Sequence, residues 1–175
     1  MKIETLNEMI DTYRYFEKIS CELANPFLSN IVTSEEEFIN NVKMIDLLYE
    51  GFWENKIKEE ELIKSTKILD TVDFSGKVIE NKKVYLKDIV GVTHCNYSFL
   101  PWIIALPILK RFYGNFPKTE EEKEKLFDKM KNNDFKEKLK LVKSNGEYYI
   151  CEGHNRIIIC KALGLEYLKA DILLN

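Results

Sequence analysis

The chain is poor in the residues on which several protein classes depend. Its 175 residues include only four cysteines and two histidines, and no C-x-x-C pair occurs. Two histidines without supporting cysteines do not make a convincing zinc site, and scattered cysteines do not make a disulfide framework. The cysteine usage therefore favours a reduced, cytoplasmic protein.

A long hydrophobic run and an excess of positive charge are also lacking. The longest apolar stretch, 98–109, contains two prolines and is too short to span a bilayer, and no N-terminal stretch resembles a signal peptide. We therefore expect no membrane association. The formal net charge is −3, which leaves DNA open as a partner but gives no support to a large phosphate-neutralising surface.

Familiar nucleotide and nucleophile motifs are missing as well. The sequence contains no G-x-x-x-x-G-K-S/T, no G-x-G-x-x-G and no G-x-S-x-G. What it has instead is a crowded polar stretch near the C-terminus, NGEYYICEGHNRIIICKALGLEYLKADILL, in which E-G-H-N-R lies between two apolar runs. The chemistry of the chain is expected there.

The N-terminal part of the chain shows helical periodicity and no such cluster. Apolar residues recur at three- and four-residue steps over 9–24, and a strong capping pattern opens a second helix over 33–50. A third helix is predicted over 58–72. We assign residues 1–76 to a helical N-terminal region.

After this region the pattern becomes mixed. Apolar and polar residues alternate over 82–92, which predicts a strand. Residues 98–114 are predicted to form a buried helix interrupted by Pro107. Thr119 followed by Glu122 is a capping pattern, which predicts a charged surface helix over 119–134.

The C-terminal part alternates strands with one helix. Two strands are predicted over 138–151, around an Asn-Gly dipeptide typical of tight hairpin turns. A helix over 157–164 ends at Gly164, and a last strand follows over 168–174. Residues 77–175 are therefore predicted to form an α/β (α+β) domain with a small mixed sheet.

The loop between the hairpin and the last helix carries the candidate site. A helix start leaves several backbone N–H groups unpaired, and an anion such as phosphate is their natural ligand. Gly153 allows a sharp turn, and Arg156, although a cation in the first turn opposes the helix dipole, suits bidentate phosphate binding. His154 and Asn155 add hydrogen-bonding groups, and Glu152 would accept a hydrogen bond or act as a base.

Plainer roles stay open for the same side chains. Arg156 would pair with Glu152 or another carboxylate, Asn155 would only cap the helix, and His154 would be a donor without chemistry. His94, the only other histidine, follows the predicted strand 82–92, at the end where α/β sheets bind ligands.

The C-terminal pattern resembles the ParB/sulfiredoxin-like superfamily, over about 84–174. That family shows a strand, a D/E-G-x-x-R loop, an alanine-containing helix, a leucine-glycine stop and a short strand. The matching positions are Glu152, Gly153, His154, Asn155, Arg156, Ala162, Leu163 and Gly164. The strand 84–89 resembles the strand that opens the family's domain.

The resemblance implies a small α/β domain of ParB/sulfiredoxin type whose loop holds nucleotide phosphates. Family members include CTP-binding partition proteins, ATP-using sulfiredoxins, free-serine kinases and proteins assigned as nucleases. Sulfiredoxins place a reactive cysteine directly before His-Arg, whereas this sequence has His154-Asn155-Arg156. Partition proteins carry a helix-turn-helix region after the domain, and this sequence stops at Asn175, so we expect neither activity. The serine kinases use an acidic residue after the opening strand, often following a histidine. In this sequence Cys95 follows His94, so that acidic residue is not evident.

The resulting prediction is a protein that binds a nucleotide or another phosphorylated small molecule through Gly153, His154, Asn155 and Arg156. If it is an enzyme, NTP hydrolysis or kinase-like phosphoryl transfer is expected, with Glu152, His154 and His94 as catalytic candidates and Mg²⁺ accompanying the nucleotide. One alternative is a DNA-directed nuclease or regulator, which needs a basic groove. Another is a non-enzymatic interaction module in which the N-terminal helices form a homodimer or bind a partner.

Overall fold

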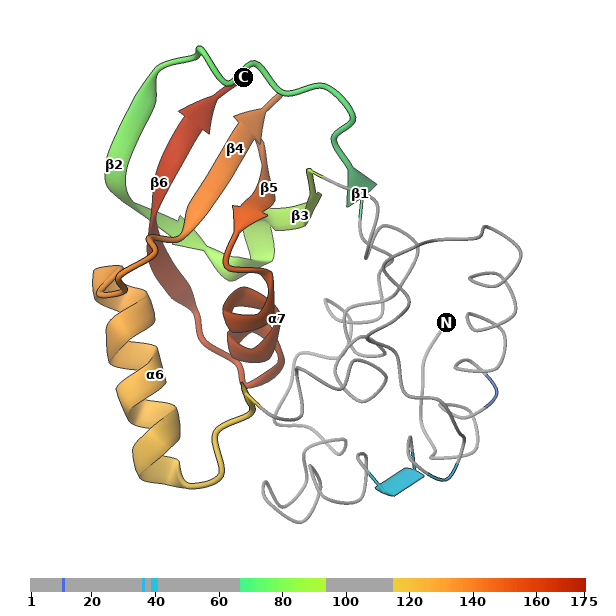
Figure 1. Ribbon diagram of the computed structural model, residues 1–175, viewed down its shortest axis with the longest axis vertical. Coiled ribbons are helices and arrows are strands. Elements are labelled where there is room, and N and C mark those ends of the chain that lie inside the picture. The colour runs from blue at the N-terminus through green and yellow to red at the C-terminus, as the bar shows by residue number, and fades with distance from the viewer. Residues whose placement is uncertain (1–10, 12–35, 37–38, 41–66, 94–114) are drawn as a thin grey trace.

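The computed structural model describes residues 67–93 and 115–175, together with residues 11, 36, 39 and 40. The last four are helical, and the rest of the predicted N-terminal helices, the predicted helix over 98–114 and His94 lie outside the described residues. The described part is a mixed α/β structure with a six-stranded sheet and two α-helices (Figure 1). No helix in this part is long and apolar enough to cross a membrane.

The sheet contains both parallel and antiparallel pairs. Its spatial order is β1-β3-β5-β4-β6-β2, which places β2 at one edge and the short β1 at the other. β1 pairs with β3, β3 with β5 and β4 with β6 in parallel, whereas β5 pairs with β4 and β6 with β2 in antiparallel fashion. The strands are Lys67–Ile68 (β1), Val78–Tyr85 (β2), Ile89–Val92 (β3), Lys140–Ser144 (β4), Glu147–Glu152 (β5) and Tyr167–Leu174 (β6).

The predicted strand over 82–92 is two strands separated by a turn. A 3-10 helix, η2 (Leu86–Asp88), separates β2 from β3. Val84, Leu86 and Ile89 are all buried, so the apolar spacing changes from two to three at Leu86. A step of three fits the 3-10 geometry, which ends one strand and starts the next.

The predicted helix over 58–72 is wrong for its last residues, because Lys67–Ile68 form β1 and 69–72 have no regular structure. β1 lies before the boundary predicted at 76, yet it pairs with β3 of the same sheet. A Cβ atom on Gly91 would overlap the backbone of Lys67, so the glycine lets the two strands approach.

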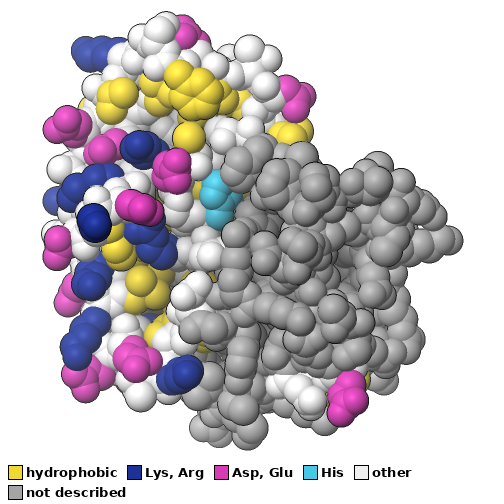
Figure 2. All heavy atoms as spheres, in the orientation of Figure 1, with side chains coloured by type: hydrophobic (Ala, Val, Ile, Leu, Met, Phe, Trp, Pro, Cys, Tyr) yellow, Lys and Arg dark blue, Asp and Glu magenta, His cyan; other side chains and the backbone are white. Residues whose placement is uncertain are grey.

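Helix α6 (Glu120–Asn132) confirms the predicted capped surface helix. Thr119 Oγ1 accepts a hydrogen bond from the Glu122 N–H at 3.1 Å, and Glu122 Oε2 accepts one from the Lys118 N–H at 2.6 Å. These two bonds satisfy N–H groups at the helix start. Figure 2 shows positive and negative side chains interspersed over the side of the molecule where α6 lies, as expected for a solvated helix face.

The predicted C-terminal elements are also present. Asn145 and Gly146 have φ angles of 51° and 85° and join β4 to β5 as a tight hairpin. Helix α7 (His154–Ala162) begins three residues before the predicted start at 157, and Gly164 follows it with a φ of 81°. Aliphatic side chains fill the core between the sheet and the helices. They include Leu139, Leu141, Val142, Ile150, Ile157, Ile158, Leu168, Ala170 and Ile172.

Candidate functional site

The polar stretch 152–156 spans the junction of β5 and α7. Glu152 is the last residue of β5, Gly153 is the N-cap of α7 with φ 95° and ψ 25°, and His154 is the first helical residue. The first intrahelical hydrogen bond runs from the Ile157 N–H to the Gly153 carbonyl, at 2.9 Å. The predicted order of strand, turn and helix is therefore confirmed, but the predicted loop 152–156 is wrong in its bounds, because only Gly153 lies between the strand and the helix.

Gly153 is required by conformation and by space. Its φ of 95° lies in the region that side-chain-bearing residues avoid. A Cβ atom there would overlap a methyl group of Leu139, and it would lie 3.4 Å from Arg156 Nη2. Because Leu139 is completely buried, its methyl group has no solvent-exposed position to move into.

We expect Gly153→Ala to lower the free energy of unfolding by about 2–3 kcal/mol, since left-handed strain and overpacking add. Gly146→Ala is the matched control, because its φ of 85° is similar but nothing lies within 4 Å of the added Cβ. It should cost only about 1 kcal/mol. Urea denaturation of both variants gives the comparison, and equal losses would show that packing against Leu139 contributes nothing.

Arg156 contacts the loop that follows α6. Its Nη1 donates a hydrogen bond to the Glu137 carbonyl at 3.0 Å, and its guanidinium carbon lies 4.3 Å from the centre of the Phe135 ring. Among the described residues Arg156 forms no ion pair. Of the two roles considered from sequence, pairing with a carboxylate is therefore not seen in this part of the chain.

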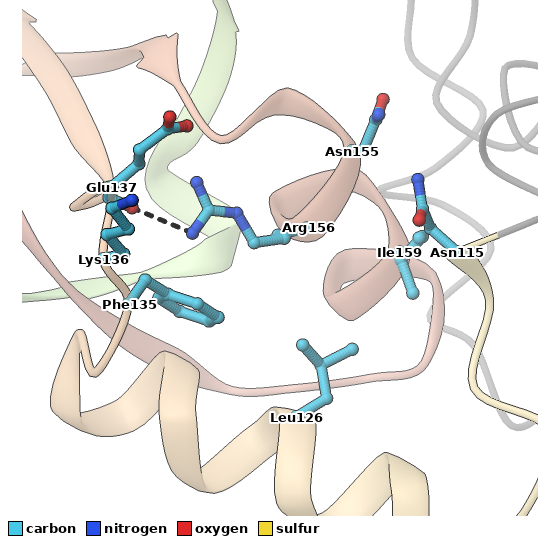
Figure 3. Close-up of a pocket in the computed structure, with 8 residues that line it drawn as sticks. All are labelled: Asn115, Leu126, Phe135, Lys136, Glu137, Asn155, Arg156 and Ile159. Atoms are coloured by element: carbon cyan, nitrogen blue, oxygen red, sulfur yellow. Dashed lines mark hydrogen bonds between the residues drawn. The ribbon is translucent and has the colours of Figure 1, made fainter.

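An open cavity of about 480 Å³ lies beside this contact. It is bounded by α6, by the loop between α6 and β4, and by the first turns of α7 (Figure 3). Arg156 extends toward the loop, whereas Asn155 projects from the other side of α7 (Figure 3). The lining residues are Asn115, Leu126, Phe135, Lys136, Glu137, Asn155, Arg156 and Ile159.

Nearby carboxylates compensate the positive charge of Arg156 only in part. Burial lowers the pKa of Arg156, and the attraction of the Glu137 and Glu152 carboxylates offsets only part of this effect. The first turn of α7 contains no acidic residue, and its N-cap offers no side-chain acceptor to the free N–H groups. The positive end of the helix dipole and a partly desolvated guanidinium therefore lie together.

Asn155 adds an unsatisfied acceptor on the other side of α7, where it also lines the cavity. Its Oδ1 atom is buried and has no hydrogen-bond partner among the described residues. Buried polar atoms almost always have a partner, and an exception near a cavity marks a place where a ligand or water would bond. Asn155 is thus positioned to hydrogen-bond a molecule in the cavity.

The other predicted site residues lie elsewhere. Glu152 is exposed and lines a second cavity, of about 270 Å³, together with Lys140 and Asp171. His154 is half-buried at the start of α7 and is not part of the lining of either cavity. Asn155 and Arg156 thus line one cavity and Glu152 lines another, although the Glu152 carboxylate still attracts the Arg156 guanidinium.

Cys151 has no activated thiol. Burial raises the pKa of the Cys151 thiol, and the Glu152 carboxylate raises it further, so the group stays protonated near neutral pH. Among the described residues there is also no group of three or more histidine, cysteine, aspartate or glutamate side chains that would hold a metal ion.

Phe135 and Lys136 are among the six cavity residues that the sequence did not indicate. They lie about twenty residues before Arg156, in the loop that follows the predicted helix 119–134. A single aromatic residue in a charged segment carries no motif. The sequence indicated only that a loop follows the helix. It could not indicate that this loop lies against α7, because that contact depends on the tertiary fold.

Comparison with known proteins adds no relative. No protein-family model matches the chain, and no curated protein or solved structure is significantly similar to it. The resemblance of residues 84–174 to the ParB/sulfiredoxin-like superfamily therefore stays a prediction. The candidate site is argued below from its own geometry.

Proposed function

We propose that this protein binds a phosphate-bearing small molecule, such as a nucleotide, in the cavity beside Arg156. The observation that carries this proposal is a partly buried arginine with no ion pair among the described residues, at the start of a helix that has no acidic first-turn residue. An anion bound there would compensate both the guanidinium and the helix dipole. A ParB/sulfiredoxin-type domain is part of the same proposal.

Size and lining suit an organic anion. Cavities of a few hundred Å³ hold drug-sized ligands, and the volume of about 480 Å³ lies in that range. Arg156 uses one donor atom on the Glu137 carbonyl, which leaves Nε and Nη2 for phosphate oxygens. Lys136 supplies a second positive charge at the rim, and Asn155 supplies the amide group for orientation.

Two carboxylates act against anion binding. Glu137 lines the cavity, and both Glu137 and Glu152 attract the Arg156 guanidinium. A nucleotide that carries Mg²⁺ on its phosphates would suffer less repulsion than a free phosphate, so Mg²⁺ is expected to enter with the ligand. The described residues offer no cluster that would hold the ion by itself.

Binding is the part of the function that the geometry supports. NTP hydrolysis or phosphoryl transfer would need a base near the ligand, and the carboxylate that lines the cavity is Glu137. Glu152 lines a different cavity, and no step is assigned to it. A reduced, cytoplasmic setting also belongs to the proposal, and Cys151 and Cys160 are free thiols.

The proposal is tested by thermal shift with ATP, CTP, GTP, their diphosphates and inorganic phosphate, with and without Mg²⁺. A ligand at about 100 times its Kd stabilises the folded state by about 2.7 kcal/mol, which raises Tm visibly. In Arg156→Gln the shift should disappear, because the amide keeps a donor but loses the charge. Without ligand, this variant should be less stable by about 1 kcal/mol through the lost Phe135 contact.

The matched control is Lys77→Gln, which removes one positive charge from an exposed loop residue that lines neither cavity. It should keep the full ligand-induced shift. If every nucleotide and phosphate left the Tm of the parent protein unchanged, the proposal would be wrong. A shift of equal size in Arg156→Gln would place the ligand outside this cavity.

A further inference from the structure

A second polar surface lies on the edge of the sheet, away from the Arg156 cavity. β2 and β6 pair in antiparallel register, with Lys83 opposite Lys169 and Tyr85 opposite Tyr167. Paired residues project to the same side of a sheet, so these four side chains share one face. The intervening pair, Val84 opposite Leu168, is buried in the core on the other face.

Two more lysines join the group from other elements. Lys87 of η2 lies 5.7 Å from the centre of the Tyr85 ring, and Lys131 of α6 lies 6.0 Å from that of Tyr167. Lys83 lies over both rings, at 4.9 Å from Tyr85 and 4.0 Å from Tyr167. The lysine–tyrosine face is defined by Lys83, Tyr85, Lys87, Lys131, Tyr167 and Lys169.

The two rings contact each other and are partly exposed, with the Lys83 ammonium over both. Their centres are 6.5 Å apart and the ring planes meet at 70°, an edge-to-face arrangement. Tyr85 is 38% exposed, and Tyr167 is half-buried. Flat aromatic surface at the edge of a sheet, with ammonium groups around it, is a stacking platform surrounded by positive charge.

The positive charge of this face lacks direct ion-pair partners within the described part of the chain. None of its four lysines forms an ion pair there, although Asp88 and Glu166 are close in sequence. Lys83 and Lys169 form a like-charge pair directly opposite each other, which destabilises a sheet. Lysines on an edge strand prevent it from pairing with other chains. That role does not explain why lysines of four different elements surround the two tyrosine rings.

We propose that the lysine–tyrosine face binds single-stranded nucleic acid. The lysines would contact backbone phosphates and the tyrosines would stack on bases, which single strands expose and duplexes hide. An acidic peptide or an anionic membrane would use the lysines but has no flat rings for the tyrosines. This surface is separate from the Arg156 cavity, so the inference goes beyond the proposed function and does not depend on it.

Fluorescence anisotropy with a labelled oligonucleotide of about twenty nucleotides, as oligothymidylate and as oligouridylate, tests the proposal at about 50 mM salt. Four phosphate contacts predict a slope of about −2.8 in log K against log salt. Lys83→Gln combined with Lys169→Gln should halve this slope. It should change stability little, because the loss of the Lys83–tyrosine contacts is offset by the removal of a like-charge pair. Lys77→Gln combined with Lys118→Gln is the charge-matched control, which should bind as the parent does.

Tyr167→Leu tests the stacking contribution separately. It keeps an apolar side chain on β6 but removes the ring, and it should weaken single-strand binding about tenfold. A duplex of the same sequence should bind more weakly than the single strand. Anionic phospholipid vesicles and polyglutamate serve as the competing polyanions.

Three results would overturn the inference. The first is no anisotropy change with either oligonucleotide at low salt. The second is equal binding of the duplex, the single strand and polyglutamate with no effect of Tyr167→Leu, which would indicate charge attraction alone. The third is binding to anionic vesicles without binding to oligonucleotides, which would assign the face to a membrane.

Discussion

Replacing Lys161 by methionine is expected to lower the free energy of unfolding by about 2–4 kcal/mol. Lys161 lies in α7 and is only 8% exposed. Its ammonium group donates hydrogen bonds to the carbonyls of Leu86 at 2.8 Å and Ile89 at 3.2 Å. Methionine fills similar space but cannot donate, so carbonyl groups at the η2 turn would lose a charged donor.

Urea denaturation measures this loss, with Lys129→Met as the control. Lys129 also lies on a helix, but its side chain is exposed, so its replacement should change stability by no more than about 0.5 kcal/mol. An unchanged stability in Lys161→Met would mean that the cost of burying the ammonium cancels its hydrogen bonds. In that case Lys161 would not stabilise the η2 turn.

Local signals predicted the C-terminal half of the described fold well. The hairpin at Asn145-Gly146, the Thr119 cap and the stop at Gly164 each depend on residues that are close in sequence. Left-handed turn positions and helix caps restrict the backbone through contacts within a few residues. For that reason a pattern of a few letters was sufficient for these elements.

The errors fall where distant residues decide the structure. The break at Leu86–Asp88 is held by Lys161, 75 residues away. β1 forms because Gly91 lets the backbone of Lys67 approach β3. Neither partner is visible in the local pattern, so the segment 67–72 was predicted as helix and 82–92 as one strand. Short apolar segments are decided by such long-range packing more than by their own periodicity.

Only part of the candidate site could be predicted, because its remaining contacts come from residues distant in sequence. The strand-to-helix turn and the constraint on Gly153 follow from local chemistry, and the structure agrees with both, although the predicted loop 152–156 is reduced to Gly153 between β5 and α7. Glu152 and Arg156 line different cavities, and this difference could not be predicted from the sequence. The partner of Arg156 comes from the α6–β4 loop, which is held by the hydrogen bond between the Leu139 N–H and the Asn133 side chain.

Replacing Asn133 by alanine is the second large effect that we expect, with a loss of about 2–4 kcal/mol in the free energy of unfolding. Asn133 ends α6 with a φ of 51° and is completely buried. Its Oδ1 accepts a hydrogen bond from the Leu139 N–H at 2.9 Å, and its Nδ2 donates one to Asn81 Oδ1 at 3.2 Å. Alanine would leave the buried Leu139 N–H without its acceptor.

Asn145→Ala separates this loss from backbone strain. Asn145 has the same φ of 51° but is exposed in the hairpin turn, so alanine there should cost only about 1 kcal/mol. Urea denaturation of both variants gives the difference, and equal losses would show that the Asn133 side chain contributes nothing beyond its conformation.

Asn133 also links the fold to the proposed ligand site. The loop that it fixes through Leu139 carries Phe135 and the Glu137 carbonyl, both of which contact Arg156. Asn133→Ala should therefore weaken nucleotide binding as well as the fold, whereas Asn145→Ala should leave affinity unchanged. Isothermal titration at a temperature where both variants are folded tests this link. Normal affinity in Asn133→Ala would show that the Arg156 contacts form without this support.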